Sequence, residues 1–128
     1  MPRLEFEDHR HDPSAWARRL GISREAVELY LASDVIDLHV DSFIWHRVAG
    51  YDLTRRHGHG LFGARAYSQV DFPRILEAQI SGATWVITTN PARSAKSRAD
   101  TFEQNLAGLR SIFAKVPEQF AVVTNVAE

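Results

Sequence analysis

The chain contains no cysteine, which excludes both a disulfide framework and a thiolate metal site. No apolar run approaches the ~20 residues that a membrane-spanning helix needs. Positive charge is not in excess, because 15 Lys and Arg residues oppose 16 Asp and Glu residues. The net charge of −1 gives no general attraction to nucleic acid or to an anionic membrane surface. Because the chain has no cysteine, any metal ion must be held by histidine and carboxylate side chains.

The composition is that of an ordinary globular protein. The 128 residues are 45% hydrophobic, which is enough for one small core. Residues 1–9 carry too many charges for a secretory signal peptide. We therefore expect a soluble, cytoplasmic protein without a nucleic-acid or membrane partner.

A histidine between two aspartates ends the first apolar stretch of the chain, which begins at Val35. If this stretch is a strand, successive side chains alternate between its two faces. His39 and Asp41 then share a face and lie about 6.5 Å apart along the strand. Neutral imidazole and carboxylate are both good zinc ligands, so the pair predicts a metal site. The opposite face would be apolar, with Ile36, Leu38 and Val40.

Two readings of this pair stay open on the residues alone. A His-x-Asp pair is short and also arises as two surface residues or a hydrogen-bonded couple. Its position at the carboxyl end of an apolar strand favours the metal site, since α/β barrels build their active sites there. Asp37 either orients a metal-binding side chain without binding the metal itself or makes a structural hydrogen bond to a neighbouring strand.

Strands and helices alternate along the rest of the sequence. We expect two short helices, starting after Asp12 and after Ser23, and then a strand over 35–40. A loop over 46–67, rich in glycine and basic residues, follows. Further on we expect a helix from Asp71, a strand over 83–88, a helix with capping-box spacing at Ser97 and Asp100, and a strand over 120–124.

This order predicts an α/β fold with parallel strands alternating with helices, preceded by two short helices. A TIM-like (β/α)8 barrel needs about 250 residues, so we expect the N-terminal part of one. Residues 1–33 would be a helical extension, and residues 34–128 the first βαβαβ portion of the barrel.

Three blocks of sequence resemble the membrane (renal) dipeptidases, zinc-dependent peptidases of the amidohydrolase superfamily. The first block is Asp37-x-His39-x-Asp41. The second is 70–76 followed by 82–85. The third and weaker block is 101–104 followed by 117–120. Ala78 stands where the family usually has glycine.

The resemblance implies a metal-dependent dipeptidase with two zinc ions, in which His39 and Asp41 are metal ligands. In the family, a bridging glutamate and two further histidines follow on later strands, and these have no counterpart in this chain. The resemblance therefore implies an N-terminal fragment with little activity alone and a dipeptide as substrate, and a homo-oligomer is possible. The catalytic proton-transfer group is not identified.

Two rival functions remain. Residues 15–33 resemble a helix-turn-helix, which predicts DNA binding. The balanced charge and the strand that follows argue against it. An apolar seam of Trp16, Leu20, Val27 and Tyr30 explains the same residues. The other rival is an amidohydrolase that acts on a non-peptide amide or ester.

The remaining histidines are weaker candidates. His57 and His59 have ligand-like spacing, but we expect them in a solvated loop. His46 either lines a substrate mouth or packs within a loop, and packing is favoured. His9 and His11 lie in a charged terminal segment for which we expect no specific role.

Overall fold

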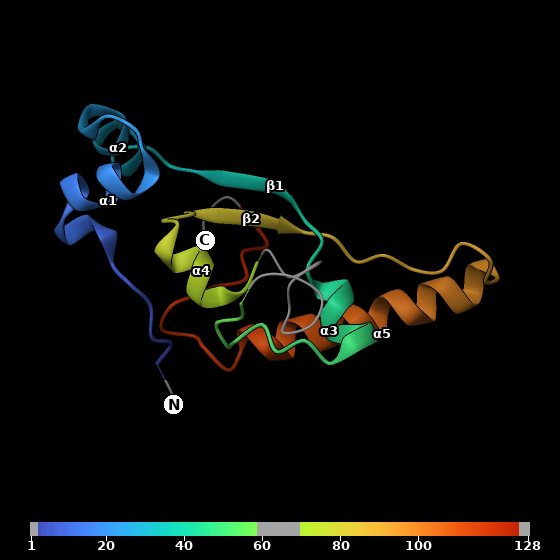
Figure 1. Ribbon diagram of the computed structural model, residues 1–128. Coiled ribbons are helices and arrows are strands. Elements are labelled where there is room, and N and C mark those ends of the chain that lie inside the picture. Colours follow the sequence, from blue (N-terminus) through green and yellow to red (C-terminus); the bar gives the residue numbers. More distant parts are fainter. Residues whose placement is uncertain (1–2, 59–69, 126–128) are drawn as a thin grey trace.

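The computed structural model of the protein describes residues 3–58 and 70–125. Figure 1 shows a mixed α/β chain whose two parallel strands lie side by side, with α3, α4 and α5 on one side of them. The predicted alternation of parallel strands and helices after two short helices is confirmed. In chain order the elements are η1 (His9–His11), α1 (Pro13–Leu20), α2 (Arg24–Leu31), β1 (Ile36–Val40), α3 (Phe43–Ala49), α4 (Phe72–Glu77), β2 (Gly82–Trp85) and α5 (Ala95–Phe113).

The first two helices begin where their caps predict. The Asp12 carboxylate accepts a hydrogen bond from Ala15 N at 2.8 Å, and the Ser23 hydroxyl accepts one from Ala26 N at 3.2 Å. Each cap satisfies a backbone N–H group that the first helical turn leaves without a partner. Gly21 ends α1 with a φ of 69°, a left-handed conformation that glycine adopts without strain.

The two strands form a parallel pair with one irregularity. Ile36 lies opposite Gly82, Asp37 opposite Ala83, and Val40 opposite Trp85, with a shift of register between Asp37 and Val40. Because parallel strands share one direction, the carboxyl ends of β1 and β2 meet at the same edge of the sheet. β2 ends at Trp85 and is shorter than the predicted strand over 83–88.

Helix α3 corrects the prediction of an unbroken loop after the first strand. It covers Phe43–Ala49 and ends at Gly50, whose φ is 65°. Phe43 is buried, so the helix begins with a side chain in the core. The glycines and basic residues of the segment predict a loop, so the sequence gives little sign of this helix of 7 residues. Residues 59–67 of the predicted loop lie outside the described residues.

Helix α5 begins three residues earlier than predicted. Ser94, not Ser97, is its N-cap, and the Ser94 hydroxyl accepts a hydrogen bond from Ser97 N at 3.3 Å. Asp100 instead pairs with Lys96 at 2.8 Å. In the described ranges, neither α5 nor any other helix has the length and apolar character needed to cross a membrane.

The predicted third strand is not formed: residues 120–124 carry no regular secondary structure. A strand needs a hydrogen-bonded neighbour. Ala121, Val122 and Val123 instead line one wall of a groove of about 420 Å³, whose other walls include β2 and α5. The described part of the chain therefore carries the start of a βαβ pattern, and a closed barrel stays a prediction.

Helices α3, α4 and α5 meet β2 in one aromatic core. Phe72 is fully buried, and its ring lies 4.9 Å from that of Phe113 and 4.6 Å from that of Phe120. The ring of Trp85 on β2 contacts Phe72 edge-on at 5.9 Å. The same core includes Phe43, Tyr51, Leu53, Ile75, Leu109, Ile112 and Val116.

A buried carboxylate fixes the start of α4. Asp71 has 0% exposure, and its side chain accepts hydrogen bonds from Arg74 N at 3.0 Å and from His57 N at 2.9 Å. The guanidinium of Arg74 donates to it at 2.8 Å and to the Tyr51 hydroxyl at 3.1 Å. A charge without exposure is tolerated only with such partners. Asp71 therefore joins α4 to the segment that follows α3.

We predict that Phe72→Ala lowers the free energy of unfolding by about 3–5 kcal/mol, because it opens a cavity among Phe113, Phe120 and Trp85. The matched control is Phe102→Ala on α5, since Phe102 is 44% exposed. We expect the control to cost less than about 1 kcal/mol. Urea unfolding followed by circular dichroism measures both. Equal losses would show that Phe72 does not centre the core.

We predict that Asp71→Ala costs about 3–5 kcal/mol, as is typical when one partner of a buried ion pair is removed. Asp100→Ala is the control, because its ion pair with Lys96 is exposed and such pairs contribute about 0–1 kcal/mol. The same unfolding experiment compares the two variants. A small loss for Asp71→Ala would mean that its buried network does not stabilise α4.

Candidate functional site

The candidate site lies at the carboxyl end of β1. His39 and Asp41 are exposed there, while Val40 between them is 3% exposed. Ser42 and Phe43, which begin the turn into α3, are buried. The buried neighbours fix the backbone on both sides of Asp41, so the strand-to-helix junction holds the two candidate ligands at the rim of the sheet.

The segment after β2 reaches the same edge. Val86 N donates to Val40 O at 2.9 Å. Arg47 on α3 donates from its guanidinium to Thr88 O at 2.7 Å. These contacts tie the residues that follow β2 to the residues that follow β1. The sequence does not indicate a role for Arg47, because the glycines and basic residues around it predict a loop.

Asp37 makes a contact that neither sequence-based alternative foresaw. Its carboxylate accepts a hydrogen bond from His39 N at 2.9 Å, within its own strand. It thus acts on the backbone of the candidate ligand, at the register shift of β1. The expected apolar face is split: Val40 is buried, whereas Ile36 and Leu38 are 60% and 75% exposed.

The donor set is incomplete as a catalytic metal centre. Among residues 3–58 and 70–125, no group of three or more His, Cys, Asp or Glu side chains is placed to hold a metal ion. Catalytic zinc usually has three protein ligands and a water molecule. His39 and Asp41 supply two donors of the right chemistry, and their role as metal ligands stays a prediction.

The other histidines have structural contacts. His46 Nδ1 lies 2.8 Å from Tyr51 O, in agreement with the favoured packing role. His57 lies in a loop, as predicted, but it is half-buried and not fully solvated: its ring stacks on that of Tyr51 at 4.0 Å, and its Nε2 lies 2.7 Å from Asp52 O. His9 stacks on Trp16 at 4.8 Å. His59 lies outside the described residues.

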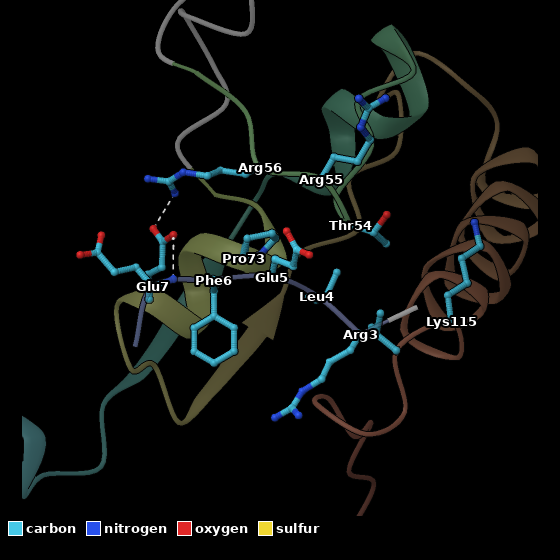
Figure 2. A pocket seen from close by; sticks show the side chains of 12 residues that line it. Arg3, Leu4, Glu5, Phe6, Glu7, Thr54, Arg55, Arg56, Pro73 and Lys115 are labelled. Atoms are coloured by element: carbon cyan, nitrogen blue, oxygen red, sulfur yellow. Dashed lines mark hydrogen bonds and ion pairs between the residues drawn. The ribbon is translucent and has the colours of Figure 1, made fainter. Parts of the chain in front are cut away.

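A separate cavity of about 840 Å³ lies between the N-terminal segment and the start of α4 (Figure 2). Two of its wall charges are neutralised by each other: Arg56 donates to Glu77 at 2.5 Å. Glu7, on the same wall, pairs with Arg19 at 2.8 Å. The described residues that line this cavity include no histidine, and nothing in it matches the predicted hydrolase chemistry.

The helix pair of the DNA-binding hypothesis is formed. Ala17 and Val27 are buried between α1 and α2, and the ring of Trp16 meets that of Tyr30 edge-on at 5.8 Å. Trp16, Val27 and Tyr30 of the predicted apolar seam thus pack within this helix pair, whereas Leu20, the last residue of α1, is 51% exposed.

Two contacts of α2 bear on DNA binding. The Tyr30 hydroxyl donates to Ala78 O at 2.5 Å, which attaches α2 to the end of α4. Arg24, at the start of α2, pairs with Glu28 at 2.7 Å. The positive charge of Arg24 at the start of α2 is therefore already paired with a carboxylate of the same helix.

Comparison with known proteins adds no identification. No family model, curated protein or solved structure matches the chain. The function must therefore be proposed from the residues and their geometry.

We predict that the protein binds no specific DNA sequence through residues 15–33. The reason is the balanced charge and the pairing of Arg24 with Glu28. Selection from a random DNA library, followed by gel-shift assays at two salt concentrations, tests this. Recovery of a defined site whose binding is lost on Arg24→Ala would establish the helix-turn-helix function instead.

Proposed function

We propose that the chain carries the first metal-binding strand of a zinc-dependent hydrolase that cleaves dipeptides. His39 and Asp41 are the proposed ligands of one zinc ion. The observation that carries the proposal is the exposure of these two side chains at the carboxyl end of a parallel strand. That edge is where α/β proteins place ligands and catalytic groups.

The chemistry of the two donors fits the metal. Imidazole nitrogen and carboxylate oxygen are both zinc ligands. Within the part of the chain that the structure describes, neither side chain forms a hydrogen bond or ion pair with another residue. Their lone pairs are therefore available to a cation, whereas His46 and His57 already contact backbone carbonyl groups.

The surrounding residues would hold the ligands in place. Val40 pairs with Trp85 and anchors the strand between the two ligands, and Phe43 anchors the turn that follows them. A zinc ion bound there supplies a Lewis acid that lowers the pKa of a coordinated water and polarises a carbonyl group. In the family that the sequence resembles, a glutamate and two histidines from later strands complete the site. We propose that activity requires them.

We predict that His39→Ala and Asp41→Ala each lower zinc affinity by about tenfold or more, because each removes a direct ligand. His11→Ala is the matched control, since His11 is exposed in the N-terminal segment. Competition with a zinc-sensitive dye measures the affinity of the purified protein. Unchanged affinity in either variant would remove that residue from the site.

The same proteins test the activity. We expect little hydrolysis of a dipeptide panel by residues 1–128 alone. A longer protein that includes the proposed later strands should show zinc-dependent, chelator-sensitive activity. This activity should fall in His39→Ala and in Asp41→Ala. Simple amides and esters are included in the panel. Cleavage of these but not of dipeptides would identify an amidohydrolase with a different substrate.

A further inference from the structure

The register of β1 and β2 shows an extra residue beside the candidate ligand. From Asp37 to Val40, β1 advances three residues, while the opposite segment, Ala83 to Trp85, advances two. One residue of β1 is therefore left without an equivalent on β2, as in a β-bulge. Bulges often lie next to active sites, where they change the direction of a side chain.

The carboxylate of Asp37 satisfies the backbone at this bulge. It accepts the His39 N–H at 2.9 Å. The pairing with β2 is regular on both sides: Val35 O accepts from Ser81 N at 2.8 Å, and Val40 O accepts from Val86 N at 2.9 Å. The bulge is thus confined to the residues between Asp37 and Val40. Within it, the Asp37 carboxylate accepts the His39 N–H.

We propose that Asp37 is a positioning residue that sets the direction of the His39 imidazole through this hydrogen bond. The inference rests on the proposed function, in which His39 is a zinc ligand. Among the described residues, no other side chain bonds to His39, so its orientation depends on its own backbone. Asp37 acts on that backbone and contributes no bond to the metal.

Two variants separate geometry from charge. Asp37→Asn keeps an oxygen at the same position but removes the charge. Asp37→Glu keeps the charge but moves the carboxylate away by one methylene group. The matched control is Asp34→Ala, because Asp34 is an exposed aspartate just before the same strand.

We expect Asp37→Asn to retain zinc affinity within about threefold, and Asp37→Glu to lower it by about tenfold, as is typical when a group that orients a ligand is lost. Asp34→Ala should leave the affinity unchanged. A dye competition assay measures affinity. Amide hydrogen exchange by NMR tests the hydrogen bond without metal: exchange at His39 should accelerate in Asp37→Glu and stay slow in Asp37→Asn.

The alternative outcomes separate the positioning role of Asp37 from the proposed function. If Asp37→Asn loses affinity as Asp37→Glu does, the charge matters and the positioning role is wrong. If Asp37→Glu binds zinc normally while His39→Ala does not, the positioning role is wrong and the proposed function stands. If His39→Ala binds zinc normally, the proposed function is wrong; slow His39 exchange that depends on Asp37 would then reflect a structural bulge only. A variant that fails to fold is replaced by Asp37→Ala, whose side chain has no oxygen to accept the His39 N–H.

Discussion

The buried carboxylate of Asp71 is the constraint on which the rest of the structure depends. It caps α4, pairs with Arg74 and accepts the N–H of His57. An unexposed charge is stable only while all of these partners stay in place. Phe72, the next residue, is thereby held in the centre of the aromatic core. A polar network that is centred on one helix start thus sets the position of the aromatic core.

The same constraint reaches the candidate site through packed side chains. Phe72 contacts Trp85 on β2, and Trp85 lies opposite Val40 on β1. Val40 lies between His39 and Asp41. Closely packed side chains transmit displacement instead of absorbing it. The core therefore fixes the carboxyl end of β1 through Val40, while the two proposed ligands on either side of Val40 remain exposed.

The sequence predicted what depends on neighbouring residues. The caps at Asp12, Ser23 and Asp71 act within three residues, so their helices were located correctly. Contacts between distant segments could not be read in the same way. The bulge between Asp37 and Val40 appears only once β1 pairs with β2. The predicted third strand is not formed, because Val122 and Val123 line a groove beside β2 and pair with no strand among the described residues.

The buried role of Asp71 also escaped prediction, because it needs Tyr51 and His57 from another segment. The sequence marks Asp71 as a helix start and gives no sign that its charge is buried. In contrast, the end of the apolar stretch is a local signal, and it places His39 and Asp41 at the carboxyl end of β1. The shared face that strict alternation predicts for the two side chains stays a prediction, because β1 is irregular between Asp37 and Val40.

One added strand could both cover the exposed apolar residues of β1 and complete the set of metal-binding side chains. Ile36 and Leu38 on β1 are more than half exposed, and apolar surface of this kind favours association. A further strand beside this sheet, from the same chain or from a second copy, would help to cover that surface. In a parallel sheet its carboxyl end would lie at the edge that carries His39 and Asp41. A strand that stabilises the sheet in this way would also be able to carry the further ligands that the proposed zinc site requires.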